Sequence, residues 1–573
     1  MKFRLLQKYH IVLILIISCF LLVLSGCSNN TDTEETTDTT TNENNAEEDF
    51  DSSWDISTST MISFDGDSIN IDGDGATTQD TTLTINSEGT YVLNGTLDDG
   101  QVIINASKDA LVRLVLNDVT ISNSDGATIH SMQARKVIVI LADESENSLS
   151  DGENYTTLEE EPNAALFSKD DLTINGTGTL QVTGNYENGI STKDNLIIVS
   201  GTINVTSVNN AIRGTDSVTI YDGTLNLTAG NDGIQSSKND DTTKGWIKVI
   251  DGIFIINASN DAIQAETTID ISGGDYTIIS GLGSTSIPTA TTDSDSYKGI
   301  KAAGNITISG GTFVIDSSDD TIHSDENITI SGGDLTLSSG DDGVHANSDL
   351  LISDTKINIK TSYEGLEGST VTIKNGDIYI LATDDGINAA GGSDSNGEGG
   401  FSPDTFNQSV KGEYYINIEG GTIEVNASGD GIDSNSDINM SGGTLYVSGP
   451  TNDGDAALDY DGTFTMSGGT IIAVGTSGMA ETPSTTSSQA SLIVYFTSSQ
   501  SAGSTIEIRD ASGKTLASYT PEKNFQSAVF STSGMAVGST YTIYVNDTAY
   551  SEVTLSSMIS SHGNGGMGNP GQR

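Results

Sequence analysis

The clearest structural signal in the chain is the stretch Ile328–Ala346, which reads ITISGGDLTLSSGDDGVHA. Apolar and polar residues alternate in two short runs, Ile328–Ile330 and Leu335–Leu337, and this period of two is typical of β-strands. A Ser-Gly-Gly turn separates the two runs, and an Asp-Asp-Gly turn follows the second. The stretch therefore predicts short strands joined by tight turns, with no helix between them.

Beyond residue 160 the same phrase recurs: two acidic or amide residues, then Gly or Ala, then a branched apolar residue. Most intervals between the apolar members are 21 to 24 residues, and longer ones indicate insertions near residues 237–246, 281–297 and 389–414. A repeat of this length is typical of a solenoid whose coils stack at the strand spacing of about 4.8 Å. The apolar members are Leu166, Ile190, Ile212, Ile234, Ile263, Ile300, Ile322, Val344, Leu366, Ile387, Ile432 and Leu458.

We predict an all-β protein whose body is a parallel β-helix. A β-propeller would need blades of roughly 40 or more residues, and calcium-binding nonapeptide repeats would need a much shorter period. The predicted segments are a lipoprotein signal peptide (1–26), a disordered acidic tether (27–53), irregular N-terminal coils that cap the solenoid (54–160), regular 22-residue coils (161–480), a small antiparallel β domain (490–556) and a disordered Gly-rich tail (557–573).

The N-terminus predicts export and lipid attachment. A basic start precedes the uncharged apolar run Ile11–Leu24, which has the length of a signal-peptide core. The run ends in Leu-Ser-Gly-Cys, which is typical of a bacterial lipoprotein processing site with Cys27 as the lipidated residue. We therefore expect a protein anchored in the cell membrane through lipid on Cys27 and exposed outside the cell. The alternative is a plain secretory signal with an incidental cysteine.

The composition excludes several function classes. The 573 residues include 79 Asp and Glu against 23 Lys and Arg, and the formal net charge is -56. Such a charge opposes binding to nucleic acid through a basic surface. Two cysteines are too few for a disulfide scaffold or a four-thiolate zinc site. We expect a monomer with no nucleic-acid partner.

Stacked coils place the recurring acids in columns with carboxylates roughly 5 Å apart, and two such charges repel by roughly 3 kcal/mol at an effective dielectric of about 20. Hard oxygen ligands in pairs suit Ca²⁺, so we predict several bound calcium ions. The alternative is that Asp and Asn are simply preferred in tight turns, where they cap their own backbone. The predicted ligands are Asp319, Asp320, Asp341, Asp342, Asp384 and Asp385, followed by Asp232, Asp261, Glu364 and Asp430.

A third column follows each apolar member and contains Lys301, His323, His345, Glu367, Asn388, Asp433 and Asp459. Together with Lys298 it forms the most chemically varied patch of the repeat. One interpretation is a site for an acidic sugar, and another is a transition-metal site of the two histidines with Glu367. The third is a solvent-facing ladder of local ion pairs.

The runs SKDDLTINGTGTLQVTGNYENGI (Ser168–Ile190) and Ile328–Ala346 resemble the carbohydrate-binding parallel β-helix family of bacterial surface proteins, which is built like polysaccharide lyases. The likeness covers roughly residues 54–475. It implies a right-handed β-helix with several Ca²⁺ ions that binds cellulose and acidic polysaccharides such as polygalacturonate. The coil at Tyr297 and Lys298 departs from the Asp-Asp-Gly pattern, so the resemblance does not imply a Ca²⁺ ion at that coil.

The predicted function is therefore calcium-dependent binding of a polysaccharide, acidic or cellulosic, at the cell surface. The carbohydrate contacts are expected from His323, His345 and Glu367 and from aromatic residues near the insertions: Trp246, Tyr297, Phe401, Phe406, Tyr414 and Tyr415. A calcium-assisted lyase is the first alternative, with Lys298, Lys301 and Arg213 as candidate bases. A structural adhesin or spacer is the second.

Overall fold

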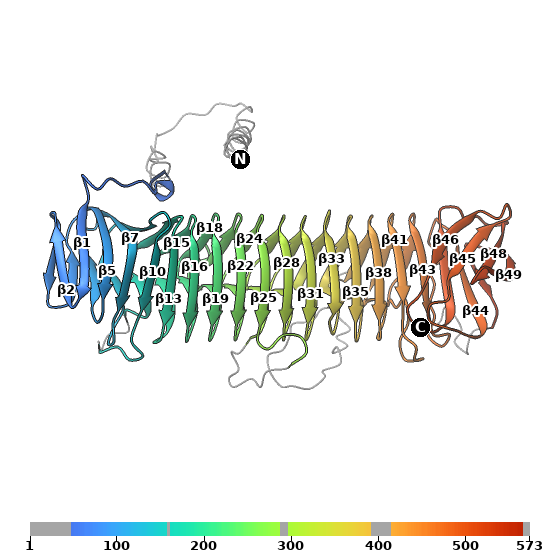
Figure 1. The fold of residues 1–573 in the computed structure, drawn as a ribbon. Coiled ribbons are helices and arrows are strands. Elements are labelled where there is room, and N and C mark those ends of the chain that lie inside the picture. The colour runs from blue at the N-terminus through green and yellow to red at the C-terminus, as the bar shows by residue number, and fades with distance from the viewer. Residues whose placement is uncertain (1–46, 157–160, 287–295, 391–413, 565–573) are drawn as a thin grey trace, which may run out of the picture. The chain divides into compact units, whose positions relative to one another are not determined.

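The structure is a computed structural model that describes residues 47–156, 161–286, 296–390 and 414–564. Residues 49–573 form one unit, separate from residues 1–48. Nearly all of its regular structure is β-strand, and short parallel strands stack along a rod (Figure 1). The predicted parallel β-helix is confirmed. No helix within the described ranges is long and apolar enough to cross a membrane.

Each coil contributes one strand to each of three parallel sheets, which form the sides of the rod. The first sheet contains β4 (Thr82–Ile85), β6 (Gln101–Asn105), β8 (Ile129–Gln133), β11 (Ala164–Ser168), β14 (Asn188–Thr192), β17 (Ile212–Gly214), β20 (Ile234–Ser236), β23 (Ile263–Ala265), β26 (Ile300–Ala302), β29 (Ile322–Ser324), the start of β32 (Val344–Ile352), the start of β34 (Leu366–Ile373), β36 (Ile387–Ala389) and β39 (Ile432–Ser434).

The second sheet contains β1 (Thr60–Gly66), β5 (Gly89–Leu97), β7 (Leu111–Ser122), β9 (Lys136–Leu141), β12 (Asp171–Gly176), β15 (Asn195–Ile198), β18 (Ser217–Ile220), β21 (Trp246–Val249), β24 (Ile269–Ile271), β27 (Ile306–Ile308), β30 (Ile328–Ile330), the ends of β32 and β34, β37 (Tyr415–Ile418), β40 (Asp437–Met440) and β42 (Phe464–Met466).

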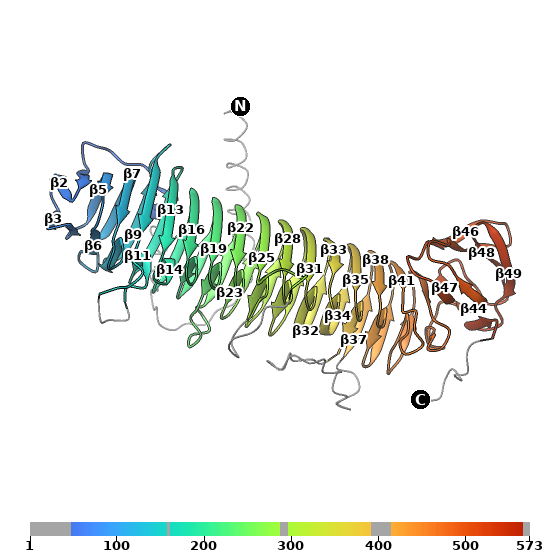
Figure 2. The ribbon, with the colours of Figure 1, turned by 60° about the horizontal axis from the view of Figure 1, so that its bottom comes forward.

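The third sheet contains β10 (Glu146–Ser150), β13 (Thr179–Gly184), β16 (Thr202–Ser207), β19 (Thr224–Ala229), β22 (Ile253–Ala258), β25 (Asp275–Ser280), β28 (Thr312–Ser317), β31 (Asp334–Ser339), β33 (Lys356–Thr361), β35 (Asp377–Ala382), β38 (Thr422–Ala427), β41 (Thr444–Ser448) and β43 (Thr470–Gly475). Its strands lie side by side along the rod in Figures 1 and 2.

The core is a set of continuous apolar ladders, because side chains alternate between the interior and the surface along each strand. On the third sheet the rings of Phe254, Tyr276 and Phe313 stack in successive coils, with 4.5 Å between neighbouring centroids. The Ser-Gly-Gly turns enter the left-handed region at their second glycine, where φ is 110° for Gly311 and 100° for Gly333. A side chain would be strained there, which explains why glycine recurs at this position.

Antiparallel pairs close both ends of the solenoid. At the N-terminal end β1 pairs with β2 (Ser68–Asp72) and β3 (Ala76–Gln79) pairs with β4. At the other end β43 pairs with β47 (Phe525–Thr532), which also pairs with β44 (Ser491–Gln500). A separate four-stranded sheet contains β45 (Ile506–Asp510), β46 (Thr515–Tyr519), β48 (Thr540–Val545) and β49 (Thr548–Thr554). Pairing at such ends covers edges that would otherwise invite aggregation.

Two predicted boundaries differ from the structure. Residues 47–53 were assigned to a disordered tether, but Asp49 is buried and its carboxylate accepts hydrogen bonds from Lys136 Nζ at 2.8 and 2.9 Å. Residues 557–564 were assigned to a disordered tail, but β50 (Ile559–His562) pairs with β44. Both errors arise because polar segments without their own core are ordered by contacts distant in sequence.

Candidate functional site

The third predicted column is present on the outer side of the first sheet. Neighbouring members pair directly in the strand register, so they are separated by one strand spacing. Its members, in coil order, are Arg213, Gln235, Gln264, Lys301, His323, His345, Glu367, Asn388 and Asp433. The rings of His323 and His345 lie 4.9 Å apart.

A column of acids lies in the turn just before each of these strands, and its members bond to the next coil. In each case Oδ1 accepts a hydrogen bond from the backbone N–H of the equivalent residue one coil later. The acceptor Oδ1 and the residue whose N–H donates to it are Asp232 with Asp261 (3.2 Å), Asp320 with Asp342 (2.9 Å), Asp342 with Glu364 (3.1 Å) and Asp385 with Asp430 (2.5 Å). The acids therefore satisfy the backbone between coils rather than within their own turn.

The second oxygen of three of these acids faces a side-chain nitrogen of the residue three positions later. The pairs are Asp232 Oδ2 with Gln235 Nε2 (2.7 Å), Asp320 Oδ2 with His323 Nδ1 (2.7 Å) and Asp342 Oδ2 with His345 Nδ1 (3.0 Å). A carboxylate whose two oxygens both accept hydrogen bonds is tolerated in a buried turn. These contacts give the second oxygen of Asp232, Asp320 and Asp342 a polar partner.

Lys298 stands in the acid column and supplies a cation from within the chain. Its Nζ donates to Asp319 Oδ1 at 2.9 Å and to Asp320 Oδ2 at 2.7 Å. Although burial alone would raise the pKa of Asp320, the ammonium of Lys298 and the hydrogen bond with His323 hold that pKa well below its usual range. We call Lys298, Asp319 and Asp320 the lysine cluster.

The three candidate bases of a lyase each contact neighbouring polar side chains. Lys298 donates to two carboxylates, which stabilise its protonated form. Lys301 Nζ donates to Ser296 Oγ at 3.1 Å, and Asp261 lies 3.7 Å away. Arg213 donates to Ser237 Oγ from Nε and Nη2, at 3.0 and 2.9 Å, and burial lowers its pKa.

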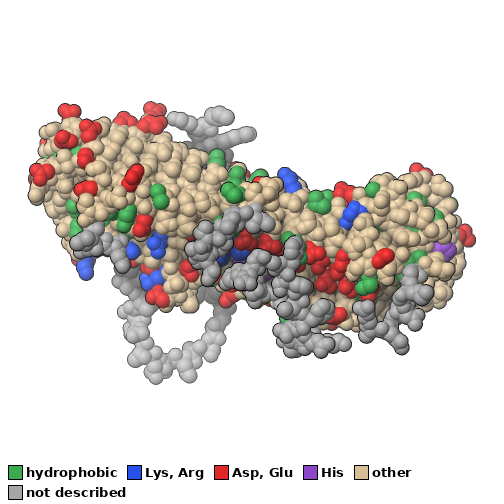
Figure 3. Space-filling model, turned by 90° about the horizontal axis from the view of Figure 1, so that it is seen from below, with side chains coloured by type: hydrophobic (Ala, Val, Ile, Leu, Met, Phe, Trp, Pro, Cys, Tyr) green, Lys and Arg blue, Asp and Glu red, His purple; other side chains and the backbone are tan. Residues whose placement is uncertain are grey.

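Further along the column an acid occupies the position of the nitrogen-bearing side chain. Asp433 follows Asp430 by three residues, at the place that histidine occupies after Asp320 and Asp342. Carboxylate oxygens of Asp385, Asp430 and Asp433 lie within 4.8 Å of one another. We call these three residues the acidic cluster. Acidic side chains gather on this side of the solenoid, over its middle and C-terminal part (Figure 3).

The protonation of the acidic cluster reflects its unbalanced charge. Burial, followed by the charge of Asp430, raises the pKa of Asp385 to about 9. Burial, followed by the charges of Asp459 and Asp455, raises the pKa of Asp430 to about 7. Three oxygen donors with partial exposure and no nitrogen or sulfur match the ligand preference of Ca²⁺. The residues present fit a calcium ion.

Asp384 lies beside the cluster. A Cβ atom placed on Gly429 would be 2.4 Å from Oδ1 of both Asp384 and Asp385, so these two carboxylates converge over a glycine. Only a residue without a side chain leaves room for them. Asp384 thus adds its charge to the acidic cluster, and its electrostatic effect raises the pKa of Asp385 after the effects of burial, Asp430 and Asp433.

The other predicted calcium ligands divide into two groups. Asp319, Asp320 and Asp341 bring oxygens within 4.8 Å of one another, but the ammonium of Lys298 already bonds to two of them. Among the residues that the structure describes, no third metal-ligating side chain joins Asp232, Asp261 or Glu364 in such a group. Asp433 was not predicted as a ligand, although its spacing from Asp430 could have identified it.

Two of the predicted aromatic residues, Trp246 and Tyr415, lie far apart along the solenoid. Trp246 begins β21 and Tyr415 begins β37, which are six coils apart on the second sheet, or roughly 29 Å at the strand spacing. Tyr297 lies in the turn before β26, and Tyr414 precedes β37. All four are half-buried. Phe401, Phe406 and Cys27 lie outside the described residues.

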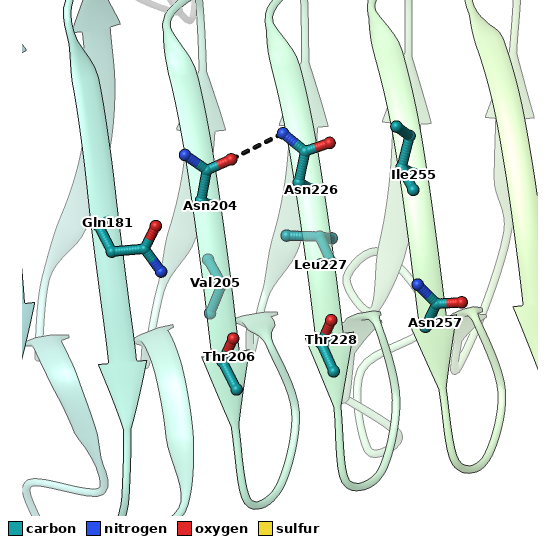
Figure 4. A pocket seen from close by; sticks show the side chains of 9 residues that line it. All are labelled: Gln181, Asn204, Val205, Thr206, Asn226, Leu227, Thr228, Ile255 and Asn257. Carbon is teal, nitrogen blue, oxygen red and sulfur yellow. Dashed lines mark hydrogen bonds between the residues drawn. The ribbon is translucent and has the colours of Figure 1, made fainter.

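A second surface, on the third sheet, is uncharged. A shallow groove of about 290 Å³ crosses β13, β16, β19 and β22 and is lined mainly by amide and hydroxyl side chains. Asn226 Nδ2 donates to Asn204 Oδ1 at 2.7 Å, and Gln181 and Asn257 flank this pair (Figure 4). No outward residue on these four strands is charged. We call this surface the uncharged groove.

The family model for carbohydrate-binding domain-containing proteins matches residues 79–343 and 342–554. The chain belongs to this family. Its matched residues include the first-sheet columns, the acidic cluster and the uncharged groove.

Two relatives are similar to parts of the chain. A carbohydrate-binding domain-containing protein of Acetivibrio thermocellus is 39% identical over 148 residues, which are 25% of this chain and 52% of that protein. The chain thus spans about half the length of this curated relative. A solved gadolinium derivative of the polysaccharide lyase-like protein from C. thermocellum is 30% identical, covering 52% of this chain and 96% of its own, with a TM-score of 0.35.

Proposed function

We propose that the protein is a cell-surface carbohydrate-binding protein that holds acidic polysaccharides through calcium bound at the acidic cluster. Membership of the carbohydrate-binding family supports the general role. The observation that carries the calcium step is the position of Asp433, a carboxylate where the equivalent coils have Gln235, His323 or His345. Two carboxylates that face each other repel, and a cation between them stabilises both.

Bound calcium would also offset the repulsion between an anionic glycan and this acidic protein. A uronate polysaccharide is an anion, and this chain has a formal net charge of -56, so direct approach is unfavourable. Ca²⁺ takes six to eight oxygen ligands. The carboxylates of Asp385, Asp430 and Asp433 would occupy part of that shell, and carboxylate or hydroxyl oxygens of the glycan would complete it. The ion would then bridge protein and ligand.

The uncharged groove extends the proposal to neutral polysaccharides. Its amides and hydroxyls can both donate and accept hydrogen bonds, as sugar hydroxyls can. Its rows repeat at the strand spacing of about 4.8 Å, which presents a regular set of polar groups to an extended chain. Exposed Ile253 and Ile255, on β22 of the groove, add apolar area for a sugar face. This surface would bind without calcium.

Anchoring at the cell membrane follows from the N-terminal sequence. The Leu-Ser-Gly-Cys motif supports lipid attachment at Cys27 and exposure on the outer side of the membrane. Replacing Cys27→Ala should release the protein into the medium, as measured by immunoblotting of membrane and culture fractions. Retention of the variant in the membrane would contradict the anchor without affecting the binding proposal.

A glycan-binding assay on immobilised polygalacturonate, with calcium or with a calcium chelator, tests the main proposal. The variant carrying Asp430→Asn and Asp433→Asn should lose retention and its response to calcium. A control carrying Asp275→Asn and Asp377→Asn removes the same charge from the third sheet and should behave like the parent. Equal retention by both variants, or retention unchanged by the chelator, would contradict the calcium bridge.

A further inference from the structure

His345 is held differently from any other residue of its column. Val344 and Ala346 point into the core, so the imidazole lies on the outer side of the first sheet, where it is 1% exposed. Its Nδ1 is 2.7 Å from Glu367 Oε2 and 3.0 Å from Asp342 Oδ2. Its Nε2 is 2.9 Å from Asn347 Oδ1. One ring nitrogen therefore faces two carboxylates from different coils.

His323, one coil earlier, is a natural comparison. Its Nδ1 is 2.7 Å from Asp320 Oδ2, and its Nε2 is 3.1 Å from Asp325 Oδ1. Each nitrogen of His323 thus faces one carboxylate, and the ammonium of Lys298 bonds to the same oxygen of Asp320. This arrangement suits a doubly protonated imidazole with one proton for each contact.

At His345 the contacts favour an ion at Nδ1. In the neutral tautomer that carries its proton on Nε2, this N–H donates to the side-chain oxygen of Asn347, and the Nδ1 lone pair is directed at Asp342 and Glu367. A lone pair facing two carboxylates is repulsive unless a proton or a metal ion lies between them. A proton on Nδ1 would have to be shared between two acceptors, whereas a metal ion would bond to all three atoms.

We propose that Asp342, His345 and Glu367 form a binding site for a divalent transition-metal ion of the Zn²⁺ type. The three ligand atoms lie within 4.8 Å of one another, and all three side chains are buried. Zinc binds imidazole nitrogen and carboxylate oxygen at about 2.0–2.2 Å, commonly with three protein ligands and one open position. The ion would replace the proton on Nδ1 and balance two buried carboxylates.

The surroundings of the three ligands have the features of a metal site. Metal-bound histidines donate their other N–H to a carbonyl or carboxylate, and Asn347 accepts that bond here. Ligating carboxylates are hydrogen-bonded in turn, and Asp342 Oδ1 accepts the backbone N–H of Glu364 at 3.1 Å. Both contacts orient the ligands toward one point.

The site differs in chemistry from the acidic cluster. Ca²⁺ prefers six to eight oxygen ligands at 2.3–2.6 Å, whereas this group has a nitrogen and only two carboxylates. A nitrogen donor favours Zn²⁺ and its neighbours over Ca²⁺. The chain would therefore bind two kinds of metal at different levels of one column, and the zinc site would stabilise the solenoid independently of any glycan.

Zinc titration of the chelator-treated full chain, in the presence of millimolar Ca²⁺, tests the proposal. The parent should bind one Zn²⁺ that calcium does not displace. His345→Gln and Glu367→Gln should each weaken this binding more than about 100-fold, beyond the effect typical of an outer-shell change. His323→Gln is the matched control and should bind Zn²⁺ within a few-fold of the parent. Equal losses in His323→Gln and His345→Gln would overturn the site.

A measurement on the parent protein avoids the risk that a variant fails to fold. X-ray absorption at the zinc edge should show a shell of nitrogen and oxygen at about 2.0–2.2 Å with the signature of one imidazole. Substitution with Co²⁺ should give the visible absorption of a four-coordinate ion. An oxygen-only shell, or no zinc retained when Ca²⁺ is present, would mean that Nδ1 carries a proton instead.

Discussion

The lysine cluster and the acidic cluster occupy equivalent turns of the same solenoid, yet their charges are balanced differently. In the former, Asp320 bonds to Lys298 and to His323. In the latter, Asp385 and Asp430 lie near Asp433, another carboxylate. Their pKa values shift in opposite directions, downward for Asp320 and upward for Asp385 and Asp430.

The difference shows that a stacked acid column is not by itself a calcium site. Each acid uses one oxygen to join the coils, and the second oxygen needs a positive or donating partner. Where the chain supplies that partner, the column is a structural element. Where it supplies another acid, the column becomes a candidate ion site. Three predictions test this comparison and a fourth tests the uncharged groove, in order of decreasing effect.

The largest effect is expected at Lys298. Lys298→Met removes the ammonium and leaves Asp319 and Asp320 without their cation in a buried turn, which should destabilise the fold by about 3–5 kcal/mol. The control Lys356→Met breaks an exposed pair with Asp334 and should cost about 1 kcal/mol or less. Denaturant unfolding followed by circular dichroism measures both. Similar losses in the two variants would contradict a special role for Lys298.

The second prediction replaces an acid of the acidic cluster with the histidine found beside the lysine cluster. Asp433→His places an imidazole three residues after Asp430, as in the coil of His323. The parent should gain about 2.7 kcal/mol of stability when free Ca²⁺ is about 100 times its Kd. The variant should show no such gain and should be more stable than the parent in chelator. Thermal unfolding with and without Ca²⁺ measures the difference. An unchanged calcium response in the variant would mean that calcium does not bind at the acidic cluster.

The third prediction concerns pH in the metal-free protein. The pKa values of Asp385 (about 9) and Asp430 (about 7) lie above the unfolded value near 3.9. Their stabilising protonation is complete below about pH 4 and is lost as pH rises through 7 and 9. The parent in chelator should therefore lose stability between pH 5 and about 9, and Asp433→His should lose less. The lowered pKa of Asp320 acts oppositely, because its contribution is lost only in acid.

The smallest effect is expected in the uncharged groove. Asn226→Asp introduces a charge beside Asn204 and removes the hydrogen bond that Asn226 Nδ2 donates to Asn204 Oδ1. This change should weaken binding of a soluble neutral β-glucan several-fold. Retention on polygalacturonate should not change. Asn358→Asp, at an outward position on β33 of the same sheet, is the matched control. Affinity electrophoresis can compare the three proteins. Equal weakening by both substitutions would place the neutral ligand elsewhere.

Much of the fold and part of the site could be predicted from the repeat. The apolar members from Leu166 to Ile432 do pair in register, and the column from Lys301 to Asp433 is present. The prediction did not separate Asp430 from Asp342, because the two occur in nearly identical phrases, although the residue three positions later differs. Their environments differ only through the residues that the neighbouring coil and the third following position bring close.

Long-range contacts also set the limits of the folded unit. Asp49 belongs to a polar stretch with no apolar period, yet it accepts bonds from Lys136 and from Thr173 on distant strands. Arg113 also donates to the backbone carbonyl oxygens of Asp51 and Ser53, so several contacts with distant strands hold this segment. No local pattern distinguishes residues 47–53 from the acidic residues before them.

The sequence by itself determined the period, the apolar ladders and the turns, since these depend on alternation and on glycine positions that act within a few residues. Only the tertiary structure decided which oxygen of each aspartate bonds to the next coil, which carboxylates face a cation and where two of them converge on one imidazole. Those outcomes depend on distances between coils, and electrostatic interactions at such distances change within a few ångströms.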